Sequence, residues 1–178
     1  MEYYGENLNH WSKVVILDLC PSLCATAKKR VQNHEGWNDI VDVVCGDACD
    51  FECEGLPAAG TVDVVTFSYA LSMIPDWKKA IENASRLLKP GGHIAVCDFT
   101  VLPDKQWRAM GTFWTWVFAH DHVHLKEEHA TVLKEIFESI DYQDGFGGFP
   151  YVPFTLQCPW YSFVGRKNKS ASKIQTNS

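Results

Sequence analysis

The chain lacks the sequence features that mark several protein classes. Its 178 residues carry a net charge of −6, with no basic run before the C-terminal tail, which argues against nucleic acid as a partner. No apolar stretch approaches the length of a membrane span. The N-terminal segment MEYYGENLNHW has neither a basic region nor an apolar core, so it does not read as a signal peptide. We therefore expect a cytoplasmic protein.

The cysteines show no metal-binding or disulfide pattern. There are seven of them, and none forms a CxxC pair. The spacing within the two groups is four residues: Cys20 and Cys24, then Cys45, Cys49 and Cys53. An odd number without an export signal predicts free thiols in a reducing compartment. A GxGxxG motif is also absent, which disfavours a dinucleotide-dependent dehydrogenase.

What is present is an alternation of apolar runs and helical patterns. The apolar fraction of 46% and charged fraction of 21% suit one globular domain. Short apolar runs predict strands at Val14 to Leu17, Ile40 to Cys45, Val62 to Phe67 and His93 to Phe99. Because helices alternate with these strands, we predict an α/β fold with a Rossmann-like, mostly parallel sheet.

The segment from Val62 to Phe99 is the most informative part of the chain. It reads as a strand, a polar turn, an amphipathic helix and a second strand. Asp76 is the predicted N-cap of the helix, and Lys89-Pro90-Gly91-Gly92 is predicted to end it. In open parallel sheets, ligands bind beyond the carboxyl ends of the strands. The turn that follows Phe67 is therefore a candidate wall of a ligand site.

The second half of the chain has a different pattern. We predict helices at residues 104–118 and at about 126–140, with Ile140 facing inward. An antiparallel β-hairpin formed by residues 142–149 and 160–165 should follow. The domain is expected to cover residues 1–167, and the polar residues 168–178 are expected to be disordered.

Two acids follow neighbouring predicted strands. Asp18 ends the first strand and Asp47 follows the second. A carboxylate in such a position can accept both hydroxyls of a ribose, and a second one can accept an exocyclic amine of adenine. The alternative is that each acid merely caps a helix or a turn. Because both acids are present and the Val62 to Phe99 segment follows them, we favour the adenosyl site over the capping role.

Several of these segments resemble a known family. The segments VVILDLCPSL, VVCGDACDF, VDVVTFSYALSMIPDW and ENASRLLKPGGHIAVCDF are similar to class I S-adenosylmethionine-dependent methyltransferases. The segments FSYALSMIPDW, WVFAHDHVHL, FGGFPYVP and YSFVGRK resemble, more narrowly, the methyltransferase portion of betaine lipid (diacylglyceryl-trimethylhomoserine) synthases. This resemblance implies S-adenosylmethionine as cofactor and the amine of a diacylglyceryl-homoserine precursor as acceptor. It runs from about residue 3 to 167.

The resemblance also implies roles for single residues. Asp18, with Leu19 beside it, would bind the cofactor ribose, and Asp47 with Ala48 would bind the adenine. The pair Ser68 and Tyr69 would face the methionine end and the transferred methyl group.

One part of the family pattern is absent. The family has a strand and a glycine-rich loop before the position of Val14, whereas the only glycine before Asp18 is Gly5. That strand would lie between the strands that end at Asp18 and Phe67, and without it both keep an unpaired edge. We therefore expect the chain to be a piece of a longer protein.

An amine acceptor must lose a proton before it attacks, so a base is expected. The candidates are Tyr69, Asp98, His120, His122 and His124. The alternating histidines could instead hold a metal or simply be structural, and we expect no metal. Aromatic faces that could hold a methylated cation come from Tyr69, Trp107, Trp114 and Trp116, although rings on a covering helix more commonly pack on the sheet.

Three functions remain open at this level. The first is N-methylation of a betaine-lipid precursor, with a lipid or small-molecule amine as acceptor and peripheral contact with a membrane. The second is methylation of another small or lipid-like acceptor. The third is a non-catalytic methyltransferase-like remnant or interaction module, because the glycine-rich loop is absent. A fused or separate aminocarboxypropyl-transferring domain is an expected partner of the first.

Overall fold

The computed structural model describes residues 10–102, 125, 128–148 and 157–169. The chain divides into two compact units, Met1–Pro57 and Ala58–Ser178, and each is described here by itself. They are called the first and the second unit below.

The first unit contains a parallel strand pair and one helix. Strand β1 (Val14–Asp18) pairs with β2 (Val41–Cys45), and the register runs from Val14 opposite Val41 to Asp18 opposite Cys45. Helix α1 (Pro21–Gln32) connects them, so this is a βαβ crossover as the sequence predicts. A small apolar core joins the helix to the strands; its buried members are Val31, Trp37 and Val41.

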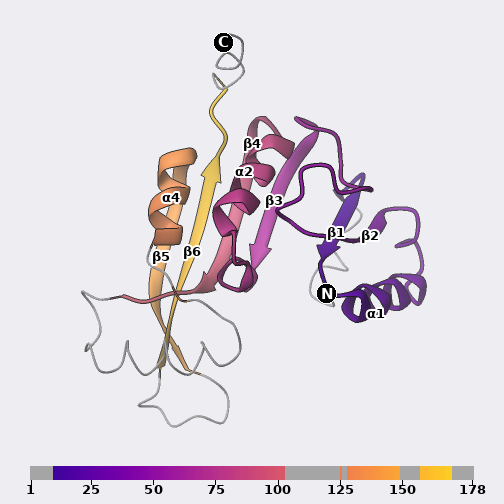
Figure 1. Cartoon of the computed structure of the whole chain (residues 1–178), viewed down its shortest axis with the longest axis horizontal. Coiled ribbons are helices and arrows are strands. Elements are labelled where there is room, and N and C mark those ends of the chain that lie inside the picture. Colours follow the sequence, from indigo (N-terminus) through magenta and orange to yellow (C-terminus); the bar gives the residue numbers. More distant parts are fainter. Residues whose placement is uncertain (1–9, 103–124, 126–127, 149–156, 170–178) are drawn as a thin grey trace. The chain divides into compact units, whose positions relative to one another are not determined.

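The second unit is built on a mixed sheet of four strands (Figure 1). Their order across the sheet is β3 (Val62–Ser68), β4 (Leu88–Phe99), β6 (Gln157–Arg166) and β5 (Glu138–Gly148). The β3–β4 pair is parallel, whereas β6 runs antiparallel to both of its neighbours. The predicted fold class, a Rossmann-like sheet with parallel strands and a C-terminal antiparallel hairpin, is therefore confirmed.

Two helices cover one face of this sheet. Helix α2 (Trp77–Leu87) follows the short 3-10 helix η2 (Leu71–Met73), and α4 (Glu128–Ile136) precedes β5. Every second residue of β4 from Ile94 to Asp98 is buried, which is the alternation expected of a strand with one covered face. The core between sheet and helices is apolar and contains Leu71, Trp77, Ile81, Ala84, Leu88, Ile94, Val96, Leu133, Phe137, Tyr161 and Phe163.

The strand pairing leaves two open edges. Within the described ranges, β1 pairs only with β2 and β3 pairs only with β4. Each of these strands therefore has one edge without a described strand partner.

Two local predictions need correction, the end of the second helix and the burial of Ile140. The helix predicted to reach residue 140 ends at Ile136, and β5 begins at Glu138, so Ile140 lies on a strand and is 54% exposed. Pairing of β5 with β6 satisfies the backbone there, and Phe137 still enters the core. Asp76 is the N-cap residue of α2 but makes no side-chain capping hydrogen bond.

The segment Lys89-Pro90-Gly91-Gly92 also behaves differently from the prediction. It does end α2, but it already belongs to β4, which starts at Leu88 opposite Val62. Gly91 adopts a φ of +83°, and its N–H donates to the carbonyl of Lys167 at 3.0 Å. A residue without Cβ accepts this backbone angle without strain, which explains the glycine.

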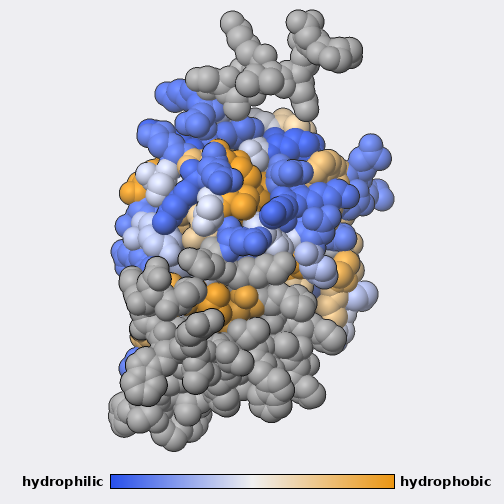
Figure 2. Space-filling view, turned by 60° about the vertical axis from the view of Figure 1, so that its left-hand side comes forward, coloured by the Kyte–Doolittle hydropathy of each residue, from blue (hydrophilic) through white to orange (hydrophobic). Residues whose placement is uncertain are grey.

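The predicted helix at residues 104–118 and the residues beyond 169 lie outside the described part of the chain. Among the described residues, no helix is long and apolar enough to cross a membrane. Hydrophilic residues occupy most of the described surface in the space-filling view, with apolar areas between them (Figure 2).

Candidate active site

The two predicted adenosyl-binding acids lie at neighbouring strand ends in the first unit. Asp18 is the last residue of β1, and Asp47 comes two residues after the end of β2. One oxygen of Asp18 accepts the N–H of Cys20 at 2.8 Å, and one oxygen of Asp47 accepts the N–H of Cys49 at 2.8 Å. These are Asx turns, which fix the direction of each carboxylate. Both acids therefore have the turn-forming role, and each keeps a second oxygen with which it could bind a ligand.

The neighbours of these acids also face a potential ligand. Leu19 is 69% exposed although it is a large apolar residue, and Ala48 is partly exposed. The strand ends are linked by a hydrogen bond from the N–H of Gly46 to the carbonyl of Asp18 at 3.0 Å. Carboxylate acceptors beside exposed apolar atoms match the hydroxyls, amine and flat ring of an adenosyl group, so these residues fit the cofactor implied by the sequence.

A cysteine with a lowered pKa follows Asp18 at the start of α1. Cys20 is the N-cap residue of α1, and Pro21 follows at the first helical position. The hydrogen bond with the Ser22 hydroxyl, together with backbone N–H groups of the first helical turn, lowers the pKa of the Cys20 thiol. Helix N-termini favour negative charge for the same reason.

Tyr69 stands in a strained backbone conformation at the end of β3. Its φ is +51°, and it is the only described residue other than glycine with a positive φ. Its N–H donates to the carbonyl of Cys97 at 2.8 Å, which holds the turn against β4. Such outliers for bulky residues cost free energy and cluster at ligand sites. Ser68, the preceding residue, is exposed at the same strand end.

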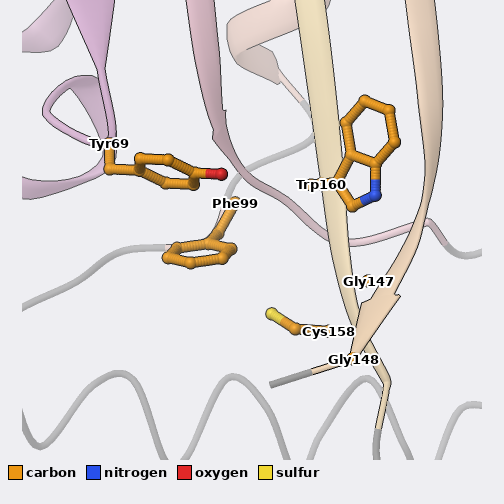
Figure 3. A pocket seen from close by; sticks show the side chains of 6 residues that line it. All are labelled: Tyr69, Phe99, Gly147, Gly148, Cys158 and Trp160. Atoms are coloured by element: carbon orange, nitrogen blue, oxygen red, sulfur yellow. The ribbon is translucent and has the colours of Figure 1, made fainter. Parts of the chain in front are cut away.

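Tyr69 forms one wall of a cavity of about 280 Å³ in the second unit (Figure 3). We call this cavity the aromatic pocket. The described residues that line it are Tyr69, Phe99, Gly147, Gly148, Cys158 and Trp160. The rings of Tyr69 and Phe99 lie 4.8 Å apart between centroids and are tilted by 42°. The pocket thus lies where β3 and β4 end, next to the antiparallel hairpin.

The indole of Trp160 lies over two glycines of the neighbouring strand. Trp160 pairs with Gly145 across β5 and β6. A Cβ placed on Gly145 would lie 3.4 Å from Cζ2 of the indole, and one on Gly147 would lie 3.4 Å from Cδ1. Gly145 and Gly147 are two residues apart, so they lie on the same face of β5. Because neither has a side chain, the ring of Trp160 can lie over them.

Two of the described lining residues are ionisable, Tyr69 and Cys158, and the pKa of each is raised. A hydrogen bond with the Cys97 thiol, followed by desolvation, raises the pKa of Tyr69. Burial raises the pKa of Cys158 to about 12. No Asp, Glu, Lys, Arg or His occurs among the described lining residues. The described walls therefore carry no charge near neutral pH.

Asp98, a predicted base, is on the other face of β4. It is fully buried, and its carboxylate accepts the N–H and the hydroxyl of Ser72 at 2.8 and 2.7 Å and the N–H of Phe99 at 2.7 Å. Desolvation raises the pKa of Asp98, although the hydrogen bonds oppose this. The geometry gives Asp98 the role of anchoring η2 and the turn after β3.

The structure therefore separates the predicted site residues into groups. Asp18, Leu19, Asp47 and Ala48 lie together in the first unit, while Ser68 and Tyr69 lie at one strand end in the second. His120, His122 and His124 fall outside the described residues, as do Trp107, Trp114 and Trp116.

Sequence reasoning missed every described lining residue except Tyr69, namely Gly147, Gly148, Phe99, Cys158 and Trp160. The signal for the last was available, because a GFGG segment on one strand of a hairpin can receive a large ring from the other.

Comparison with known proteins gives this geometry a family. A family model described as a methyltransferase domain matches residues 5–144, which is most of the chain. The chain belongs to this methyltransferase family. Among curated relatives, the ubiquinone/menaquinone biosynthesis C-methyltransferase UbiE of Roseobacter denitrificans is 33% identical over 95 residues, which cover 53% of this chain and 36% of the relative. The demethylmenaquinone methyltransferase of Clavibacter sepedonicus is 27% identical over 71% of this chain and 49% of its own length.

Solved structures show the same fold. A candidate methyltransferase of Bacillus halodurans superposes with a TM-score of 0.69 at 18% identity, covering 88% of this chain and 83% of that chain. The geranyl diphosphate C-methyltransferase of Streptomyces coelicolor, bound to S-adenosyl-L-homocysteine, gives 0.68 at 12% identity over 88% of this chain and 63% of its own. The methyl donor of the family is S-adenosylmethionine. The matched part of this chain spans about a third to a half of the length of these curated relatives.

Proposed function

We propose that this protein is an S-adenosylmethionine-dependent N-methyltransferase that methylates the amine of a diacylglyceryl-homoserine precursor of a betaine lipid. The observation that carries the proposal is the aromatic pocket, whose described walls are aromatic and uncharged. The narrow resemblance of the FSYALSMIPDW and YSFVGRK segments supports the same acceptor.

The chemistry of an amine acceptor suits these walls. S-adenosylmethionine, when bound, supplies an electrophilic methyl group on a positively charged sulfur. The amine must reach it unprotonated, and a site of low polarity lowers an amine pKa because it disfavours the charged form. Tyr69 and Cys158 stay protonated near neutral pH and so do not compete as nucleophiles. The main contribution of the pocket is then to orient the amine.

We further propose that the acids of the first unit bind the donor. Asp18 and Leu19 would contact the ribose, and Asp47 and Ala48 the adenine. The Asx turns support this because they hold both carboxylates at the carboxyl ends of parallel strands. A lipid acceptor also requires access to a membrane surface, so we propose peripheral contact with a bilayer.

A second acceptor class is favoured by the curated relatives. Of the two named above, one is a ubiquinone/menaquinone biosynthesis C-methyltransferase and the other a demethylmenaquinone methyltransferase, and they are 33% and 27% identical to the aligned part of this chain. An aromatic pocket could hold a quinol ring by stacking. Methylation of a quinol carbon needs a base for the ring hydroxyl, just as methylation of an amine needs one for the ammonium, so the described lining residues do not separate the two acceptors.

A methyl-transfer assay separates the two. The chain is incubated with methyl-labelled S-adenosylmethionine and either diacylglyceryl-homoserine or a demethylmenaquinol, and the lipid products are identified by mass spectrometry. We expect trimethylated product from the amine only. Methylation of the quinol alone would replace the proposal by the second function, and binding of neither donor nor acceptor would indicate a non-catalytic remnant.

The donor site has a matched control on the same strand pair. Asp18→Asn and Asp47→Asn should each weaken S-adenosylmethionine binding about tenfold, since a charge-assisted hydrogen bond is lost. Asp42→Asn makes the same change on β2, where Asp42 forms only an exposed ion pair with Lys13 at 2.8 Å. Its binding should stay unchanged, and an equal loss in all three variants would argue against specific roles.

A further inference from the structure

Three aromatic side chains from separate elements line the aromatic pocket. Figure 3 shows the rings of Tyr69 and Phe99 next to each other and the indole of Trp160 on the hairpin side. Tyr69 follows β3, Phe99 ends β4, and Trp160 lies in β6. Because the Tyr69 and Phe99 rings are tilted by 42° rather than stacked, they do not cover each other face to face. Tyr69 is 49% exposed, so part of its ring surface can meet a ligand.

The backbone around two of these residues restricts where they can lie. The indole of Trp160 lies close to Gly145 and Gly147, because a Cβ added to either glycine would meet the ring at 3.4 Å. Tyr69 is fixed by its hydrogen bond to the Cys97 carbonyl in an unusual backbone conformation. A preorganised wall loses little side-chain entropy when a ligand binds.

We infer that the aromatic pocket binds the methylated ammonium group of the acceptor, against the rings of Tyr69, Phe99 and Trp160. This inference rests on the proposed function, because it assumes an amine acceptor. Aromatic faces attract cations through their quadrupole, and the effect grows when the cation is poorly hydrated. Each added methyl group lowers the cost of removing the ammonium from water. The pocket should therefore bind the fully methylated ammonium, which has no proton to lose, more tightly than an unmethylated one.

We expect Trp160 to be the residue that makes the pocket prefer a methylated cation over a neutral molecule of the same shape. The described lining offers no carboxylate to pair with an unmethylated ammonium, so recognition depends on ring faces. Among the three rings, an indole attracts a cation most strongly. Replacing Trp160 should therefore affect a methylated cation more than a neutral molecule of the same shape.

The test uses choline chloride and its neutral isostere 3,3-dimethylbutan-1-ol as probes, titrated into the full chain and followed by NMR. Choline should bind more tightly than the alcohol. Trp160→Leu should weaken choline binding about tenfold and the alcohol by less than about threefold. Trp160→Phe, which keeps an aromatic face, should lie in between. Trp11→Leu removes an exposed indole from the first unit, where Trp11 is 44% exposed, and should change neither affinity.

Three outcomes would overturn the inference: no saturable choline binding, equal losses for choline and the alcohol in Trp160→Leu, or loss of choline affinity in proportion to added S-adenosylmethionine. The last would assign the rings to the donor sulfonium instead. Should Trp160→Leu fail to fold, Trp160→Phe and Phe99→Leu provide the same comparison.

The methyl-transfer assay keeps this inference separate from the proposed function. Choline binding that depends on Trp160, without methylation of diacylglyceryl-homoserine, would refute the proposed acceptor but not the cation site. Methylation of that lipid with choline binding indifferent to Trp160 would refute the cation site alone.

Discussion

The carboxylate of Asp98 holds both hydrogen-bond donors of Ser72, the backbone N–H at 2.8 Å and the hydroxyl at 2.7 Å. Ser72 belongs to η2, and Asp98 belongs to β4, 26 residues later in the chain. Both residues are buried. This contact ties the turn after β3, and with it Tyr69, to the centre of the sheet.

The first prediction concerns the pH dependence of this contact. Because desolvation raises the pKa of Asp98 in the folded state, the folded protein holds this proton more tightly than the unfolded chain does. The contribution of Asp98 to the free energy of unfolding is therefore greatest below the ordinary Asp pKa of about 3.9. It is lost as pH rises from there through the raised pKa of the folded state. Asp98→Asn cannot ionise. We expect the stability advantage of the native chain over Asp98→Asn to shrink as pH increases across that window, in urea unfolding curves. An advantage that grows with pH would contradict the raised pKa.

The second prediction concerns strain at Tyr69. Its positive φ suits glycine, whereas alanine carries the same steric penalty as other L-residues. Tyr69→Gly and Tyr69→Ala both remove the contact with Phe99. The glycine variant should nevertheless be more stable by up to about 1 kcal/mol, because relief of strain outweighs its larger chain entropy. Paired urea titrations measure the difference, and a more stable alanine variant would show that the turn is not strained.

The third prediction concerns thiol reactivity. Cys20 has a lowered pKa at the start of α1, whereas burial raises the pKa of Cys158 to about 12. With iodoacetamide at pH 7.5, Cys20 should be alkylated well before Cys158, as peptide mass spectrometry would record. Ser22→Ala should slow alkylation of Cys20, because it removes the hydroxyl 3.1 Å from the sulfur. Thr26→Ala, one turn further along α1, should not. Equal rates for the two cysteines would exclude the proposed effect of the helix N-terminus.

The fourth prediction concerns packing at Gly165. A Cβ there would lie 2.6 Å from Cε1 of Phe163 and 2.8 Å from Cβ of Phe137, and both rings are buried. Gly165→Ala should therefore destabilise the fold by about 1–3 kcal/mol through overpacking. Gly148→Ala is the matched control, since a Cβ there meets nothing within 4 Å. Thermal unfolding of both variants tests this, and similar melting temperatures would mean that the core relaxes easily.

Much of the fold could be read from local patterns. The runs at Val14 to Leu17 and Val62 to Phe67 became β1 and β3, each one residue longer. The apolar stripe that begins at Trp77 became α2. Such patterns depend on the spacing of apolar residues over short stretches, which can be seen in the sequence itself. The boundary between α4 and β5 was misplaced, because Phe137 and Ile140 fit a helical period as well as a strand.

The candidate site was less predictable. Asp18 and Asp47 could be chosen because strand ends are visible in the sequence. Phe99 and Trp160 could not be joined to Tyr69, since their proximity depends on the pairing of β4 with β6 over about 60 residues of chain. Asp98 was taken as a possible base because its residue type allows it. Asp98 is buried and bonded to Ser72 because its side chain lies on the core-facing side of β4, and the residue type alone does not reveal this.

The sequence by itself determined the family, the alternation of strands and helices and the identity of the strand-end acids, because these are properties of residue type and local spacing. The tertiary structure decided which face of each strand a residue occupies and which distant residues share a cavity. A shift of one residue in register would move Trp160 to the opposite face of β6. The aromatic pocket therefore exists only through the long-range pairing that the sequence alone does not state.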